Sequence, residues 1–216
     1  MTRGGLPALA ELEIGDEPEA WERLGFGVTA DGTTVVGGVT LRLAGRAGGE
    51  GLRGWSLRAE APLSESIDGI ATRTAGAEAG GTAVPHANGA ARLDHVVVRT
   101  PALDRTLAAL QATGMELRRV RDAGTPERPL RQGFLWAGDV LIEVAGPPGE
   151  SSPDPAGLWG LVVVVPELER LRDLGGGVIG EIRDAVQPGR RIATVPREAG
   201  LSVPLAFMTP HEGAAR

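Results

Sequence analysis

The sequence predicts an α+β protein made of repeated βαβββ modules that pair into curved mixed sheets around a cleft. Short runs of β-branched residues recur along the chain, and a proline and helically spaced leucines follow the two strongest runs. Stretches rich in glycine, alanine or proline separate the segments that carry these patterns. The second and third segments repeat the same order of patterns, which indicates an internal repeat.

The first segment, residues 1–73, carries the weakest copy of this pattern. Residues 10–14 read as a strand and residues 18–24 as a short helix, and two further strands are expected at 33–43 and 52–58. Because the predicted helix is barely two turns long, we interpret this segment as a truncated, divergent βαβββ-like module.

Two linkers divide the chain. Residues 74–91 consist mainly of small side chains that cannot form a core, and residues 146–156 contain four prolines that exclude a helix. The last residues, 211–216, form a short tail.

The middle segment, residues 92–145, gives the clearest copy of the module. A strand is expected at 93–100, and Pro101 lies where the first turn of a helix accepts a proline. Strands are expected at 133–137 and 140–144. The helix after the first strand is indicated by leucines at helical spacing and a terminating glycine: Leu103, Leu107, Leu110 and Gly114.

The last segment, residues 157–210, repeats this layout. A strand is expected at 158–165, followed by Pro166, and further strands at 191–195 and 201–207. The expected helix carries Leu168, Leu171 and Leu174 and ends at glycines 175–177.

Composition excludes several classes of function. The chain has no cysteine, which excludes disulfides and thiolate metal sites, and a net charge of −6, which disfavours nucleic-acid binding. Its strongest apolar run, residues 157–166, is about half the length that a membrane helix needs. We therefore expect a cytoplasmic protein with no nucleic-acid or membrane partner.

The order of elements resembles the vicinal oxygen chelate superfamily, which includes glyoxalase-like, bleomycin-resistance-like and extradiol dioxygenase-like proteins. The resemblance is carried by residues 93–100, 101–115, 133–139 and 140–144. It implies that two βαβββ modules pack together, and the short linker between the last two modules favours that pair.

His95 and Glu143 are the main candidates for chemistry. His95 shares one face of its strand with Val97 and Arg99, and Glu143 is a lone carboxylate in an apolar strand, so a buried partner is expected. An imidazole beside a carboxylate suits a divalent ion, but a metal-free structural hydrogen bond explains the pair equally well. The resemblance implies that His95 and Glu143 are metal ligands for Zn, Ni, Mn or Fe.

The equivalent positions of the other modules cannot bind a metal. Alignment on the two prolines places Gly160 and Ala206 opposite His95 and Glu143, and the first module has Leu12 and Arg58 there. The chain therefore supplies two ligands at most. We expect a homodimer, and two copies of residues 92–145 that face each other across its axis would rebuild a four-ligand set.

Five residues are predicted to bind a small, anionic organic ligand. The strand arginines suit a carboxylate or phosphate, and the aromatic residues suit pocket walls, although a solvated strand face and core packing are the simpler interpretations. The predicted set is Arg131, Gln132, Phe134, Trp136 and Arg191.

Two functions follow from these features. The first is a metal-dependent lyase, isomerase or dioxygenase of the glyoxalase-like type, in which the metal acts as a Lewis acid or Glu143 acts as the base. The alternative is a metal-free protein that binds a small molecule without catalysis, as the drug-sequestering members of the superfamily do.

Overall fold

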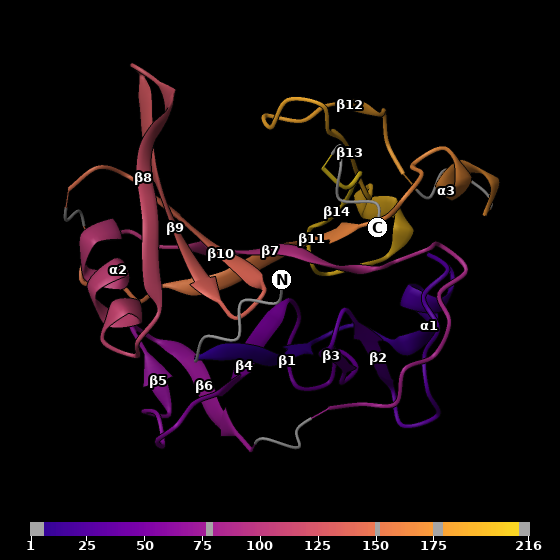
Figure 1. Cartoon of the computed structure of the whole chain (residues 1–216), viewed down its shortest axis with the longest axis horizontal. Helices are drawn as coiled ribbons and strands as arrows, with labels where there is room; N and C mark the ends of the chain where they lie inside the picture. Colours follow the sequence, from indigo (N-terminus) through magenta and orange to yellow (C-terminus); the bar gives the residue numbers. More distant parts are fainter. Residues whose placement is uncertain (1–6, 77–79, 150–151, 175–178, 212–216) are drawn as a thin grey trace. The chain divides into compact units, whose positions relative to one another are not determined.

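The computed structural model describes residues 7–76, 80–149, 152–174 and 179–211. The chain divides into two units, each assembled from separate segments (Figure 1). Unit 1 comprises Met1–Leu12, Arg53–Ala79 and His95–Trp159, and unit 2 comprises Glu13–Leu52, Gly80–Asp94 and Gly160–Arg216.

The fold class is α+β, as predicted, because two mixed sheets carry most of the regular structure and the helices are few and short. The helices of the described ranges are α1 (Pro18–Glu22), α2 (Leu103–Gln111), α3 (Arg170–Asp173) and the 3-10 turn η1 (Arg197–Ala199). None of them is long and apolar enough to span a bilayer.

In unit 1, a βαβββ segment contributes the strand order β7-β10-β9-β8. The central strand β10 is parallel to β7 and antiparallel to β9, which is antiparallel to β8. The elements are β7 (Arg92–Arg99), α2, β8 (Glu116–Thr125), β9 (Arg128–Ala137) and β10 (Val140–Gly146). This pairing follows the order of elements that the sequence predicts for residues 92–145.

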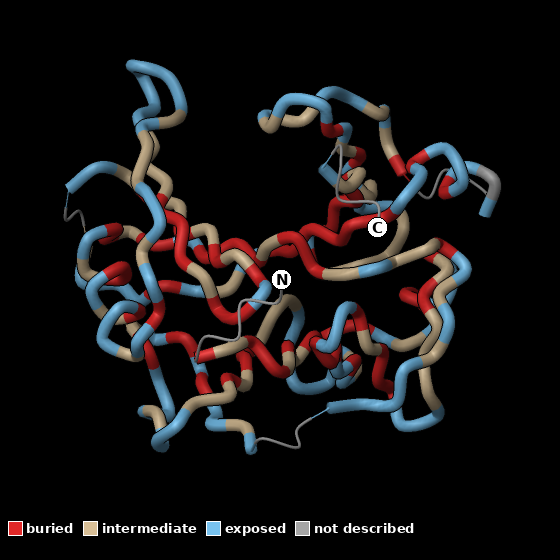
Figure 2. The backbone as a smooth tube through the Cα atoms, in the orientation of Figure 1, coloured by how far each residue is buried: buried red, intermediate tan, exposed pale blue. Residues whose placement is uncertain are grey.

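The helix α2 covers one face of these strands. Its buried leucines include Leu103, Leu107 and Leu110, at the predicted helical spacing. A Cβ atom at Gly133 in β9 would lie 2.5 Å from a Leu107 methyl group, so the glycine allows the helix to approach the sheet closely. Figure 2 shows that the buried residues follow the strands, whereas the tip of the β8–β9 hairpin is exposed.

In unit 2, the last segment has the same topology. β11 (Gly157–Val164) pairs in parallel with β14 (Leu205–Met208), and the order continues through β13 (Arg191–Thr194) to β12 (Arg183–Asp184). Two predictions for this segment are wrong in length. The helix α3 is a single turn, and β14 begins only after Pro204, which has no N–H to donate to a sheet. The predicted glycine stop, residues 175–177, lies outside the described residues.

The N-terminal segment differs from its prediction in two places. The strand expected at 33–43 is a hairpin of β2 (Thr33–Val36) and β3 (Val39–Leu43), because Gly37 and Gly38 both adopt positive φ and form its turn. The remaining strands are β1 (Ala8–Ile14), β4 (Leu52–Arg58), β5 (Ser66–Ile67) and β6 (Ile70–Ala75), of which β5 and β6 were not expected.

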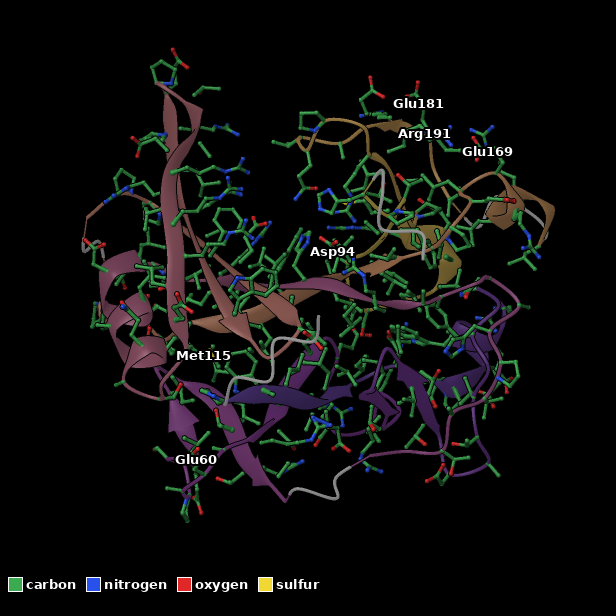
Figure 3. All side chains as sticks on the ribbon, viewed as in Figure 1. Glu60, Asp94, Met115, Glu169, Glu181 and Arg191 are labelled. Atoms are coloured by element: carbon green, nitrogen blue, oxygen red, sulfur yellow. The ribbon has the colours of Figure 1, made fainter. Side chains whose placement is uncertain are left out.

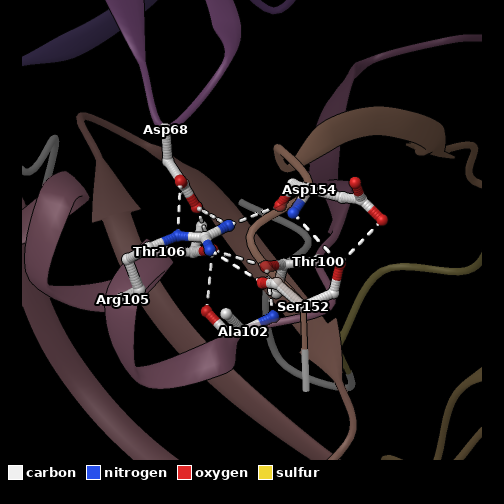
Figure 4. Close-up of polar contacts among 7 residues, drawn as sticks. All are labelled: Asp68, Thr100, Ala102, Arg105, Thr106, Ser152 and Asp154. Atoms are coloured by element: carbon white, nitrogen blue, oxygen red, sulfur yellow. Dashed lines mark hydrogen bonds and ion pairs between the residues drawn. The ribbon is translucent and has the colours of Figure 1, made fainter. Parts of the chain in front are cut away.

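A partly buried network anchors the β5–β6 turn of unit 1 to α2 (Figure 4). Asp68, at positive φ in that turn, accepts hydrogen bonds from Arg105 Nε at 2.7 Å and from the Thr106 hydroxyl. Thr106 also bonds the hydroxyl of Thr100. The other guanidinium nitrogens of Arg105 donate to the backbone carbonyls of Ser152 and Asp154.

Unit 2 has its own buried ion pair, between Asp94 and Arg190, whose side chains are 8% and 1% exposed. Arg190 Nη2 lies 2.6 Å from Asp94 Oδ1. The remaining donors of Arg190 bond the carbonyl of Thr209 and the side chain of Gln187. Because the buried guanidinium is paired with a carboxylate and also donates hydrogen bonds to its other neighbours, we interpret this ion pair as structural.

Candidate functional site

His95 and Glu143 lie on neighbouring parallel strands and face the same side of the sheet. The register pairs Leu141 with His95 and Glu143 with Val97, so the two side chains are diagonal neighbours. His95 Nε2 is 3.7 Å from Glu143 Oε2, and the side chains are 12% and 15% exposed. The structure therefore brings together the two residues that the sequence singles out.

Gln132 fixes the orientation of the Glu143 carboxylate. Its Nε2 donates a hydrogen bond to Glu143 Oε1 at 2.5 Å, while its Oε1 accepts one from Arg121 Nε at 2.8 Å. Because arginine can only donate, Arg121 determines which end of the amide faces Glu143. The carboxylate thus has one oxygen held by an amide and the other directed to His95.

The side chains of this face form three rows across the strands. The first row contains His95, Leu141 and Trp136, and the second contains Val97, Glu143, Phe134 and Arg119. The third row contains Arg99, Ala145, Gln132 and Arg121. We call the set His95, Glu143, Gln132, Phe134, Arg119 and Arg121 the β7–β10 cluster.

Arginines pack against the aromatic residues of this face. The guanidinium carbons of Arg119 and Arg121 lie 4.8 and 5.3 Å from the centre of the Phe134 ring. Arg99 lies 3.8 Å from the ring centre of Trp159, also in unit 1. Such contacts place positive charge above an aromatic surface.

The predicted ligand-binding residues fall into two groups. Gln132, Phe134 and Trp136 share the face of Glu143, because they alternate along β9. Arg131 lies on the opposite face, where its Nε is 3.3 Å from Asp122. Arg191 belongs to unit 2.

Arg191 forms a two-pronged ion pair with Glu169 (Figure 3). Its guanidinium lowers the pKa of the Glu169 carboxyl below its ordinary value, because the hydrogen bonds stabilise the ionised form. The same hydrogen bonds and charge raise the pKa of Arg191. The donors of Arg191 that face Glu169 are therefore already used within unit 2.

Arg119 and Arg121 were not predicted. A β-bulge between Leu117 and Arg119 shifts the pairing by one residue, so Arg119 faces the same side as Phe134. Simple alternation in the strand does not reveal that shift. The signal in the sequence is the dense run of arginines at 118, 119 and 121.

The donor set suits a divalent ion in its chemistry but is small. An imidazole nitrogen and a carboxylate oxygen are ordinary ligands, and two atoms bound to one ion lie about 3–3.4 Å apart, close to the observed 3.7 Å. Among the residues that the structure describes, no three His, Cys, Asp or Glu side chains lie together as a metal site. His95 and Glu143 therefore provide two ligands of an incomplete set.

Comparisons with known proteins identify a fold. Neither a family model nor a curated relative matches the sequence. A mutant of 4-hydroxymandelate synthase from Streptomyces coelicolor is 14% identical, with a TM-score of 0.61 over 94% of this chain and 92% of that one. A fusion of a xylose isomerase-like TIM barrel with 4-hydroxyphenylpyruvate dioxygenase is 13% identical, with a TM-score of 0.63 over 98% of this chain.

The chain spans 50% of the length of that fusion protein. Methylmalonyl-CoA epimerase from Mycobacterium tuberculosis is also similar, at 19% identity and a TM-score of 0.46 over 62% of this chain and 97% of that one. The two proteins with the higher TM-scores show the fold, and it is the fold that the sequence predicts.

Proposed function

We propose that this chain, which has the vicinal oxygen chelate fold, acts on a small organic molecule at the β7–β10 cluster, with His95 and Glu143 as the reactive pair. The supporting observation is the geometry of Glu143, a largely buried carboxylate with one oxygen held by Gln132 and the other 3.7 Å from an imidazole. Groups that exchange protons or bind cations are arranged in this way.

In this proposal, His95 and Glu143 hold a divalent cation, for which Zn, Ni, Mn and Fe are the candidates. A bound cation supplies Lewis acidity to an oxygen of the substrate. Gln132 keeps the carboxylate in place by donating to Oε1, so that Oε2 stays directed to His95. Alternatively, without a bound cation, Glu143 Oε2 would act as the base and accept a proton from the substrate.

A metal-free binding protein is the second candidate. It is favoured by the small donor set, because no third acidic or histidine ligand accompanies the pair within the described residues. The Gln132 amide does not act as a third ligand either, because its NH₂ donates to Glu143 and its oxygen accepts a hydrogen bond from Arg121. In this case Glu143 and His95 bind polar groups of a ligand without turnover.

A homodimer would resolve the shortage of ligands. If two copies of the β7–β10 cluster face each other across a two-fold axis, one cation would take two imidazoles and two carboxylates. The proposal then requires one metal ion for each pair of chains. A monomer that binds one ion for each chain supports a two-ligand site completed by water or substrate.

Titration of the metal-free chain with Mn²⁺, Ni²⁺, Zn²⁺ and Fe²⁺ by calorimetry, together with the solution mass, tests the proposal. We expect His95→Ala and Glu143→Gln to abolish binding, since each removes half of the donor set. His211→Ala is the matched control, because His211 is exposed and its ring contacts Arg190 in unit 2. Binding that survives both site variants, or no binding of any ion, would overturn the metal-dependent function.

A further inference from the structure

We propose that Arg119 and Arg121 form an anion-binding subsite for a carboxylate or phosphate group of the molecule bound at the β7–β10 cluster. This inference rests on the proposed function, because it names the class of substrate on which His95 and Glu143 would act. That class is a small organic acid or a phosphate ester.

The two arginines point to the same region of the sheet face. They occupy alternate positions of β8, opposite Phe134 and Gln132. The bulge after Leu117 brings Arg119 into this alternation. Both guanidinium carbons lie within 5.3 Å of the centre of the Phe134 ring, so the two positive groups converge on one buried ring.

These charges have no carboxylate partner among the described parts of the chain. Within the described ranges, the Arg121 guanidinium uses only its Nε, in the bond to Gln132, and the Arg119 guanidinium makes no hydrogen bond or ion pair. Two cations beside one ring repel each other, and a bound anion would remove that repulsion. Guanidinium groups bind carboxylate and phosphate oxygens through paired N–H donors, which both arginines retain.

The other charged groups of this face leave the subsite positive. Glu143 is the nearest carboxylate in the same row, and its Oε1 is already engaged by Gln132. Glu116 lies at the end of the first row, opposite Trp136. Arg99 adds a third positive charge on β7.

The spacing sets the size of the ligand. Glu143 and Arg119 lie on strands separated by β9, so their backbones are about 10 Å apart. Phe134 lies between them in the row and is 4% exposed. A molecule with an anionic group at one end and a reactive group at the other fits this span.

Calorimetric binding of four compounds to the full chain, without added metal, tests the subsite. Benzoate and phenyl phosphate carry the anion, inorganic phosphate carries it without the ring, and benzamide is the neutral analogue. We expect benzoate or phenyl phosphate to bind at least about tenfold more tightly than benzamide, the loss expected when a charge-assisted hydrogen bond is removed. Equal binding of benzoate and benzamide would overturn the subsite. Failure of both inorganic phosphate and phenyl phosphate to bind would also overturn it.

Arg119→Gln is the decisive variant, because it removes a charge without breaking any hydrogen bond of the fold. It should weaken benzoate binding by about tenfold or more, and Arg119→Lys should restore part of it. Arg128→Gln makes the same charge change near the exposed tip of the hairpin and should leave binding unchanged. Equal losses in Arg119→Gln and Arg128→Gln would show a general charge effect and contradict the subsite.

A failure of the subsite can be distinguished from a failure of the proposed function. Glu143→Gln should remove metal binding but retain benzoate binding, since the carboxylate is not part of the subsite. If benzoate depends on Arg119 while His95→Ala and Glu143→Gln leave metal binding intact, the subsite stands and the metal-dependent function is wrong. If Arg119→Gln has no effect while metal binding follows the pair, the subsite is wrong and the function stands.

Discussion

The two complete βαβββ segments of the chain share one topology and differ in the chemistry of one face. Glu143 pairs with Val97 in the first segment, and Ala206 pairs with Val162 in the second. The register thus confirms the equivalence that the two prolines predicted. Where the first segment carries a polar cluster, the second carries an apolar cluster of Val162, Ala206 and Met208, with Ala185 and Ile192 packed against it.

The difference extends to the backbone at the histidine position. A Cβ atom at Gly160, the equivalent of His95, would lie 2.7 Å from the carbonyl oxygen of Pro204. A side chain there requires the neighbouring strand to move. The same fold can therefore differ in chemistry, because the chemistry depends on which side chains line one face of the sheet.

The largest expected effect concerns stability, not binding. Arg190→Ala leaves Asp94 buried without its main partner, and this should lower the free energy of unfolding by about 3–5 kcal/mol in urea titrations. The exposed Arg128→Ala should change it by no more than about 0.5 kcal/mol. A loss below about 1 kcal/mol for Arg190→Ala would show that the ion pair is not structural.

A carboxylate introduced into the second segment tests whether its apolar face tolerates a charge. Ala206→Glu places a charge in the apolar cluster, and we expect a loss of about 1–3 kcal/mol in thermal or urea unfolding. Ala145→Glu is the matched control, because Ala145 lies in the row of Arg99 and Arg121. Equal losses of unfolding free energy at both positions would show that the two faces do not differ in their tolerance of a negative charge.

Glu143→Gln should separate function from stability. The new amide oxygen can still accept the hydrogen bond from Gln132, so the free energy of unfolding should change by less than about 1 kcal/mol. Metal binding should be lost. A large loss of stability with binding retained would instead make Glu143 a structural residue.

The smallest expected effect is the titration of Glu169. Its pKa is lowered in the folded state by hydrogen bonds from Arg191, so the pair stabilises the fold fully above the ordinary glutamate pKa and loses this contribution as the pH falls through the lowered one. Arg191→Gln should raise the pKa toward its ordinary value, as measured by carbon NMR of the carboxyl group. An unchanged pKa would show that the ion pair is absent in solution.

Much of the fold was predictable because the strongest patterns agree with the structure. The β-branched run of β7, the leucines of α2 and the apolar alternation of β10 lie where the sequence places them. Together they position His95 and Glu143 on one face. Their separation of 3.7 Å depends on the register of two parallel strands, which no local pattern specifies.

The failures have local causes. Gly37 and Gly38 divide one predicted strand into a hairpin, and Pro204 delays the start of β14. The bulge after Leu117 reverses the expected alternation, so the alternation pattern does not predict the arginines of the β7–β10 cluster. Arg131 is one residue out of phase with Gln132 and faces Asp122, and its role in ligand binding stays a prediction.

Backbone amide chemical shifts, recorded during a benzoate titration, identify the segment that binds the ligand. We expect saturable shifts that centre on the backbone amides of Gln132, Phe134 and Glu143, with little change at Thr194 and Ala206, which pair in the second segment as Phe134 and Glu143 do in the first. Shifts that centre on Thr194 and Ala206, or that spread without saturation over both segments, would contradict the assignment of the binding face to the first segment.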